Sequence, residues 1–290
     1  MRTRIISGIV MGVIVAAVLT LGFVWDSIVI TVAIALIAAV AVYELLGNAA
    51  GIKDKIATGG ACVFTALYVI GADNALADKI FSLTTHSPLS IASEAQKFYN
   101  YWSYAVTGIM VCYFIFAAVM ILKNHKDFGL GQIASLFALP FPYAYFFSCL
   151  NSVIGHNDGI YYLLLLLNFS SVCDMGAYFT GVTIGKHKLC PNISPKKTVE
   201  GAIGGIVSSI IFTLIITLCF GKSIFLPLIL TIPLCILGMI GDLFASAIKR
   251  SVNLKDFGSL IPGHGGILDR VDSIIMIVPL MYLMIQIGIL

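Results

Sequence analysis

The chain has 290 residues, of which 59% are hydrophobic and only 11% are charged, and its formal net charge is +3. This apolar content is higher than the core of a soluble domain requires, so it excludes an ordinary soluble protein. So small a net charge gives no reason to expect a nucleic acid as a partner. We therefore predict an all-α, polytopic integral membrane protein, because helices satisfy their own backbone polar groups in lipid.

Apolar runs long enough to cross a bilayer recur along the whole chain. A span needs roughly 20 residues, and by that measure we expect about nine transmembrane helices. They lie near residues 5–24, 27–47, 57–72, 101–122, 130–150, 160–184, 201–220, 224–247 and 267–289. The first run follows "MRTR" but has no small-residue cleavage site before a polar domain, so we interpret it as a retained helix. Residues 73–100 form the one sizeable loop, which we interpret as a spacer or lid on the outer side.

The distribution of positive charge predicts the orientation of the chain. With the N-terminus in the cytoplasm, all of the 17 Lys and Arg residues lie on the inner side except Lys79, Lys97 and Lys222. This bias predicts an odd number of spans, a C-terminus outside, and inner loops at 185–200 and 248–266. We expect residues 1–160 to form a scaffold or dimer region, and residues 161–290 to form the catalytic region that carries both loops.

Carboxylates inside membrane spans are costly and call for a partner or a function. Asp174 and Asp242 lie in apolar surroundings, while Asp269 and Asp272 share one face at the start of the last span. One interpretation is that these acids form salt bridges or cap helices. The other is that they bind a hard cation such as Mg²⁺, because several carboxylates that converge without Cys or paired His as ligands are typical of such a site. Mg²⁺ in turn suggests a phosphate substrate.

The inner loop "GKHKLCPNISPKKTVEG" supplies cations that complement such a site. Lys196, Lys197 and Thr198, followed by Glu200, are typical of a helix start, where free backbone N–H groups favour an anion. A basic loop that only sets topology is the alternative. The stretch "GVTIGK" is not a P-loop, since it is one residue short and His187 stands where Ser or Thr should bind Mg²⁺.

The stretch 246–272 carries the most specific pattern in the chain. It contains S-x-I-K-R, then K-D-x-G, then I-P-x-H-G-G-I-x-D-R-V-D. This series resembles the signature of the phosphatidate cytidylyltransferase family, the CDP-diacylglycerol synthases. The segment "CDMGAYFTGVTIGKHKLCPNISPKKTVEG" is similar to a second characteristic segment of that family. The resemblance covers about the last 120 residues.

The resemblance implies an enzyme of the cell membrane, inner or plasma, that joins CTP and phosphatidic acid into CDP-diacylglycerol and pyrophosphate at a cytoplasmic site. It implies Mg²⁺ held by Asp242 and Asp269, with a second cation left open. The further catalytic candidates are Lys249, Arg250, Lys255, Asp256, Arg270 and Asp272. The candidates for substrate binding are Asp174, Ser194, Lys196, Lys197, Thr198, Glu200 and His264, although a lone His in a Gly-rich turn is more often structural.

Two other functions stay open from the sequence. A transporter of an anionic solute also uses buried acids and bases, but its two halves should carry matching interruptions, whereas the charged motifs here lie in the last third. A cytidylyltransferase that acts on another lipid phosphate would share the same motifs. The spacing Gly201-x-x-x-Gly205 suits close approach of two helices, either within one chain or between the copies of a homodimer.

Overall fold

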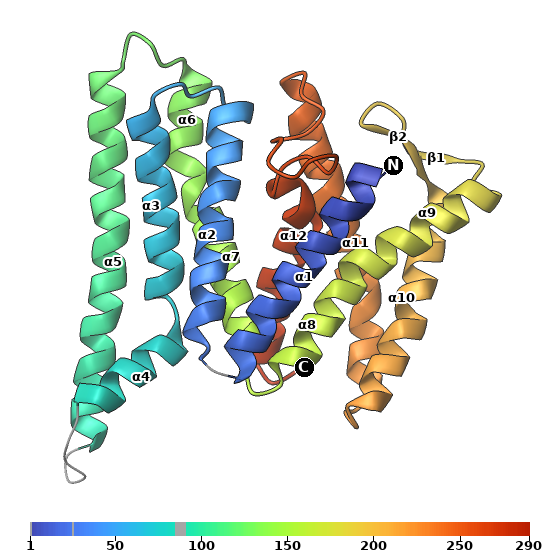
Figure 1. Ribbon diagram of the computed structural model, residues 1–290, viewed down its shortest axis with the longest axis horizontal. Coiled ribbons are helices and arrows are strands. Elements are labelled where there is room, and N and C mark those ends of the chain that lie inside the picture. The colour runs from blue at the N-terminus through green and yellow to red at the C-terminus, as the bar shows by residue number, and fades with distance from the viewer. Residues whose placement is uncertain (1, 25, 85–90) are drawn as a thin grey trace. The chain divides into compact units, whose positions relative to one another are not determined.

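The computed structural model describes residues 2–24, 26–84 and 91–290, and it is mostly helical (Figure 1). The chain forms two compact units. Unit 1 comprises Met1–Gly155 and Asp256–Leu268, and unit 2 comprises His156–Lys255 and Asp269–Leu290. The predicted division after residue 160 separates a scaffold from a catalytic region. Because it is a division by function, it stays a prediction.

Long apolar helices confirm a polytopic membrane protein. Within the described part of the chain, seven are long and apolar enough to cross a membrane, and an eighth candidate is a helix pair bent by 61°. The seven are Ile6–Val24, Ile28–Ala49, Gln96–Lys123, Leu130–Ile154, Gly159–Ile184, Val199–Cys219 and Phe225–Ser251. The last helix, Leu268–Gln286, is not among them, and it carries three charged residues in its first two turns. The predicted number of nine spans and the predicted sides of the termini therefore stay predictions.

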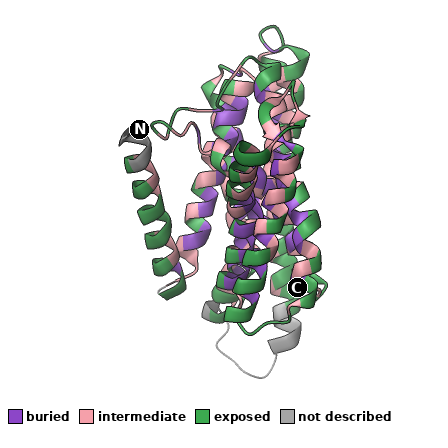
Figure 2. Cartoon of the chain, turned by 90° about the vertical axis from the view of Figure 1, so that its right-hand side faces the viewer, coloured by how far each residue is buried: buried purple, intermediate pink, exposed green. Residues whose placement is uncertain are grey.

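Unit 1 contains the helices of the first half of the chain. They are α1 (Arg2–Val24), α2 (Ile28–Glu44) continued by the π-helical η1 (Leu45–Ala49), α3 (Lys55–Gly71), α4 (Asn74–Thr84), α5 (Ile91–Lys123), α6 (Leu130–Ala138) and α7 (Pro140–Ile154). Helix α3 packs against α2, α5 and α7, while α1 packs against α2. Figure 2 shows the helix at the N-terminus almost entirely exposed, as an apolar helix facing lipid would be.

The core of unit 1 lies between α2, α3, α5, α6 and α7. Phe64 stacks on Tyr113 with 4.2 Å between the ring centroids, and Phe141 meets Phe64 edge-on. The Tyr113 hydroxyl donates a hydrogen bond of 2.6 Å to the Leu136 carbonyl. A buried phenol needs such a partner, so this contact fixes α5 against α6 as well as filling the core.

Residues 73–100 are not the open loop expected from the sequence. Helix α4 occupies Asn74–Thr84 and α5 begins at Ile91, while residues 85–90 of the predicted loop lie outside the described part. Asp73 explains the start of α4, because its buried carboxylate accepts hydrogen bonds from the Ala75 N–H and from Thr31. The hydropathy of this segment is modest, so it did not predict helices that are polar on one side.

Unit 2 contains α8 (Gly159–Leu167), the π-helical η2 (Asn168–Val172), α9 (Cys173–Ile184), the strands β1 (Lys188–Cys190) and β2 (Ser194–Thr198), α10 (Val199–Cys219), α11 (Phe225–Ser251) and α12 (Leu268–Gln286). In addition to the helices of the predicted fold class, the strands form a small two-stranded antiparallel sheet. Its register pairs Lys188 with Thr198 and Cys190 with Ser194. Pro195 favours this extended backbone because a residue before proline avoids the helical region.

Close packing of α9 on α10 explains the Gly201-x-x-x-Gly205 spacing. A Cβ atom at Gly201 would lie 2.7 Å from the Ala177 carbonyl oxygen, and one at Gly205 would lie 2.6 Å from that of Cys173. Both glycines are buried against α9. The motif is therefore used within one chain, and it gives no support to a dimer.

Candidate active site

The hairpin of unit 2 delivers a lysine to a carboxylate in a membrane-spanning helix. Lys197 on β2 forms an ion pair with Asp242 on α11, and both side chains are about three-quarters shielded from solvent. Asp242 was predicted as a metal ligand and Lys197 as a phosphate-binding group. The structure brings these two predicted residues into direct contact, although they are distant in sequence.

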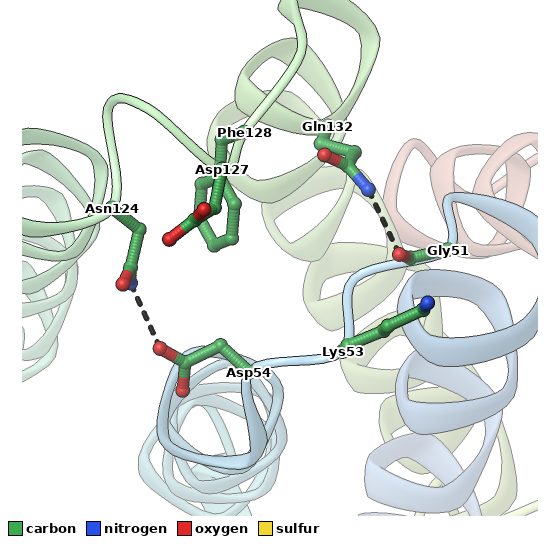
Figure 3. A pocket seen from close by; sticks show the side chains of 7 residues that line it. All are labelled: Gly51, Lys53, Asp54, Asn124, Asp127, Phe128 and Gln132. Atoms are coloured by element: carbon green, nitrogen blue, oxygen red, sulfur yellow. Dashed lines mark hydrogen bonds between the residues drawn. The ribbon is translucent and has the colours of Figure 1, made fainter.

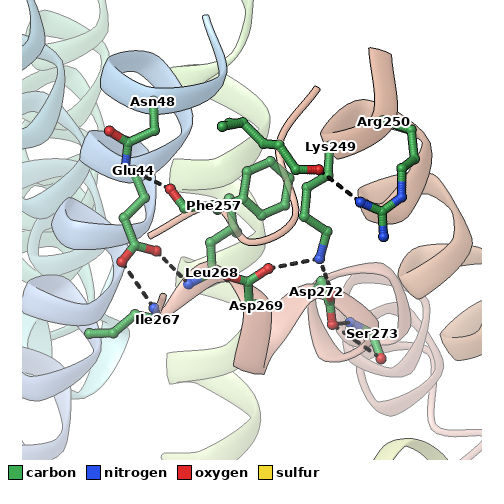
Figure 4. Close-up of polar contacts among 11 residues, drawn as sticks. Glu44, Asn48, Lys249, Arg250, Phe257, Ile267, Leu268, Asp269, Asp272 and Ser273 are labelled. Carbon is green, nitrogen blue, oxygen red and sulfur yellow. Dashed lines mark hydrogen bonds and ion pairs between the residues drawn. The ribbon is translucent and has the colours of Figure 1, made fainter. Parts of the chain in front are cut away.

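A second ion pair lies between the end of α11 and the start of α12 (Figure 4). Lys249 donates a hydrogen bond of 2.7 Å to Asp269, and its Nζ lies 4.0 Å from the Asp272 carboxylate. The two helices come this close because Gly241 has no side chain, and a Cβ there would lie 2.9 Å from the Asp272 carbonyl oxygen. Lys249, Asp269 and Asp272 thus form one largely buried group.

The two ion pairs belong to one electrostatic neighbourhood. Asp242 interacts with Asp174 in the first turn of α9 and with Asp272 on α12. Lys197 interacts with Asp174, and Lys249 with Asp272. Four predicted acids and two predicted lysines therefore gather where β2, α9, α11 and α12 meet. Such alternating charges are the arrangement that phosphate groups and a bound cation can enter.

The base of the hairpin is held by groups that were predicted to bind substrate. The Glu200 carboxylate accepts a hydrogen bond from the Lys186 N–H at 3.0 Å, and it lies 2.6 Å from the His187 ring nitrogen. Thr198 is the N-cap of α10, and its hydroxyl accepts from the Gly201 N–H. Both side chains have structural partners here, while Lys196 on β2 is exposed at the surface of the hairpin.

The remaining predicted residues are spread over the end of α11, the signature loop and the start of α12. The Arg250 guanidinium donates to the Leu254 carbonyl, which closes the end of α11. Lys255 of unit 2 and Asp256 of unit 1 are exposed, as is Arg270 of unit 2. Ser194 begins β2 opposite Cys190.

The signature loop of unit 1, residues 256–268, is a tight turn built on glycine. Gly263 and Gly265 have φ values of +79° and +86°, which other residues rarely adopt. The Ile261 N–H donates to the Gly265 carbonyl and the His264 N–H donates to that of Ile261. The His264 ring lies 2.8 Å from the Ser7 hydroxyl of α1, so this predicted substrate-binding residue has a contact within unit 1.

Glu44 and Asn48 are the residues that sequence reasoning missed. The Glu44 carboxylate accepts from the Ile267 and Leu268 N–H groups, and Asn48 donates to the Phe257 carbonyl at 2.6 Å (Figure 4). A signal was present, because Glu44 is an acid in the apolar stretch "VAVYELLG" and so calls for a partner.

The donor atoms at the two ion pairs suit Mg²⁺. Among the residues whose placement is described, no three His, Cys, Asp or Glu side chains form a group that could hold a metal ion alone. Mg²⁺ does not require such a group, since it keeps several waters and uses one or two carboxylates with substrate phosphates. The acids here offer oxygen only, which fits a hard cation.

A polar cavity of about 520 Å³ lies elsewhere in unit 1 (Figure 3). Its lining includes Lys53, Asp54, Asn124, Asp127 and Gln132. Asp54 caps α3 and accepts a hydrogen bond from the Ala57 N–H. This hydrogen bond holds the pKa of the Asp54 carboxyl below its usual range. None of the lining residues belongs to the two signature segments, and we assign the cavity no role.

Comparison with known proteins identifies the family. The model of the cytidylyltransferase family matches residues 2–288, which is nearly the entire chain. The chain belongs to the cytidylyltransferase family. The stretch that matches individual relatives is shorter. It is 44% identical over 131 residues to the phosphatidate cytidylyltransferase of Staphylococcus haemolyticus, and 46% identical over 134 residues to that of Staphylococcus saprophyticus. These matches cover 44% and 45% of this chain, and 50% and 52% of the relatives, so they span about half of each protein.

Proposed function

We propose that this member of the cytidylyltransferase family transfers the cytidylyl group of CTP to phosphatidic acid. A phosphate oxygen of the lipid attacks the α-phosphorus of CTP, the bond from that phosphorus to the β-phosphate oxygen breaks, and pyrophosphate leaves. The products are CDP-diacylglycerol and pyrophosphate. The observation that carries the proposal is that the ion pairs Lys197–Asp242 and Lys249–Asp269 lie in the segments that bear the family signature and interact through Asp272.

The residues support this chemistry without a protein nucleophile. A phosphate monoester has a second pKa of about 6, so it is largely ionised at neutral pH and needs little help from a general base. Its attack on a triphosphate is opposed by charge repulsion. Lysine ammonium groups at Lys197 and Lys249 reduce this repulsion and hold the reacting phosphates in line.

We assign Asp242 and Asp269 as the carboxylates that would hold Mg²⁺, with Asp272 and Asp174 beside them. When bound, the metal supplies positive charge to the phosphate oxygens and to the departing pyrophosphate. Lys197 pairs with Asp242 and Lys249 pairs with Asp269, so each of the two assigned carboxylates lies next to a positive charge. Whether one or two cations bind is tested by metal titration.

The proposed location is the inner or plasma membrane with the site facing the cytoplasm, where CTP is present. The excess of Lys and Arg in the loops around the site supports this orientation. A homodimer remains an expectation, and the mass of the purified protein in detergent tests it.

One assay tests the proposed reaction. Purified protein in detergent is given CTP labelled in the cytosine ring, phosphatidic acid and Mg²⁺, and the label that enters the organic phase is counted. We expect labelled lipid and an equal amount of pyrophosphate, and neither without phosphatidic acid. Equal or greater transfer to a polyprenyl phosphate would assign another lipid substrate. The absence of transfer to every lipid phosphate would overturn the proposal and favour transport.

A further inference from the structure

Glu44 occupies a position that its own helix does not explain. Its side chain is buried, with 3% of the residue exposed, at the last position of the apolar helix α2. The helical backbone continues past Glu44 through η1 to Ala49, so the side chain does not close a helix end. Burial of a carboxylate adds a desolvation cost. Glu44 therefore must be stabilised by groups outside α2.

Those groups are backbone N–H donors of the signature loop. One carboxylate oxygen accepts from Ile267 at 3.1 Å and the other accepts from Leu268 at 2.9 Å. Leu268 is the first residue of α12, so its N–H is one of those that a helix cannot satisfy internally. Glu44 thus caps a helix that begins more than two hundred residues later in the chain.

The loop is shaped to admit this carboxylate. A Cβ atom at Gly258 or at Gly266 would overlap the Glu44 side chain, so both positions need glycine for the contact. One turn further along, Asn48 donates to the Phe257 carbonyl at 2.6 Å (Figure 4). The two side chains therefore hold the loop near both of its ends, at Phe257 and at Ile267 and Leu268.

We propose that Glu44 is a positioning residue for the active site: it holds the backbone at Ile267 and Leu268, from which the chain continues directly into the site. The residue after Leu268 is Asp269, which we have assigned to the metal and which pairs with Lys249. An error of about 1 Å in such a group can lower a rate by about a hundredfold. The inference rests on the proposed function for its effect on catalysis, but the contact of Glu44 with the loop can be tested without it.

The first test measures amide hydrogen exchange of the full-length protein in detergent, by mass spectrometry of peptides that cover residues 257–268. Glu44→Gln keeps the shape but turns one acceptor into an N–H donor that faces backbone N–H groups. We expect exchange in this peptide to accelerate about tenfold or more, because protected amides lose a carboxylate partner. Asp54→Asn is the matched control, since Asp54 also accepts two backbone N–H bonds at a helix start in unit 1. It should accelerate exchange at residues 56 and 57 and leave 257–268 unchanged.

The second test measures turnover of the same proteins. Glu44→Gln should lower kcat about a hundredfold with little change in the KM for CTP, whereas Asp54→Asn should retain the wild-type kcat. Gly266→Ala keeps the Glu44 carboxylate but places a methyl group against it, so it should lower kcat to a similar extent. It is the second test variant if Glu44→Gln folds poorly.

Unchanged exchange at 257–268 in both Glu44→Gln and Gly266→Ala would overturn the contact, and accelerated exchange with wild-type kcat would overturn the positioning role. A wild-type protein without turnover would instead reject the proposed reaction and the catalytic role with it, and the exchange result would still decide the contact.

Discussion

Lys249 donates a 2.7 Å hydrogen bond to Asp269, and only 10% and 3% of these side chains are exposed. The lysine lies in the last turn of α11 and the aspartate lies in the first turn of α12. A buried pair of this kind is costly to form and far more costly to break, because removal of one partner leaves the other charge without compensation. The pair therefore links the proposed chemistry to the stability of unit 2.

Replacement of Lys249 by Met should lower the free energy of unfolding by about 3–5 kcal/mol, since Asp269 would be buried without its main partner. Thermal or chemical unfolding of the purified protein in detergent measures this change in the free energy of unfolding. Lys222→Met is the matched control, because its ion pair with Asp158 is more exposed and should contribute much less. The double variant Lys249→Met/Asp269→Leu should recover most of the stability without recovering turnover. A double variant as unstable as the single one would contradict this account.

Asp242→Asn and Asp269→Asn should each reduce turnover by at least about a thousandfold, because an amide keeps the shape but loses the charge that binds Mg²⁺. Initial rates across a Mg²⁺ titration, with folding checked by gel filtration, provide the measurement. Asp26→Asn is a suitable control, since Asp26 pairs with Lys79 in unit 1, outside both signature segments. Near wild-type rates at modest Mg²⁺ in either site variant would show that the ligands lie elsewhere.

Lys197 and Lys196 should serve the phosphates of CTP. A lysine acts on phosphate chiefly as a point charge, so Lys197→Arg should keep part of the activity and Lys197→Ala should lose most of it. We expect the KM for CTP to rise, or kcat to fall, with little change in the apparent affinity for phosphatidic acid. Protease mapping must first show native insertion, because loop charge also influences topology. Unaltered CTP kinetics in a correctly inserted Lys196→Ala/Lys197→Ala variant would place the nucleotide elsewhere.

The charge distribution predicts that residues 185–200 and 248–266 face the cytoplasm. Single cysteines introduced at Lys188 and at Ser259, both exposed positions, report on this after the native cysteines are replaced. They should resist a membrane-impermeant thiol reagent in intact cells and react once the cells are permeabilised. A cysteine introduced at Lys222 is the control and should react in intact cells. The opposite labelling pattern would reverse the predicted orientation.

The sequence by itself determined the class of fold and where the charged residues are concentrated. Hydropathy is a local property, so helix after helix was predicted close to its observed range, including α10 and α11. Charged residues are rare in this chain, so their concentration at Asp242, Lys249 and Asp269 was visible without any structure. Local composition failed where polarity was mixed, as in α4, and where a loop formed a hairpin, as in β1 and β2.

Only the tertiary structure decided which charges are partners. The sequence left Asp242 and Asp269 as metal ligands or salt-bridge partners, and the fold pairs them with Lys197 and Lys249 respectively. It also revealed that Glu44 caps α12 from α2. The physical reason is that a hydrogen bond depends on distance in space, so the residues next to a carboxylate in sequence do not indicate its donor. The donor to Glu44 is a backbone N–H, a group that every residue except proline carries.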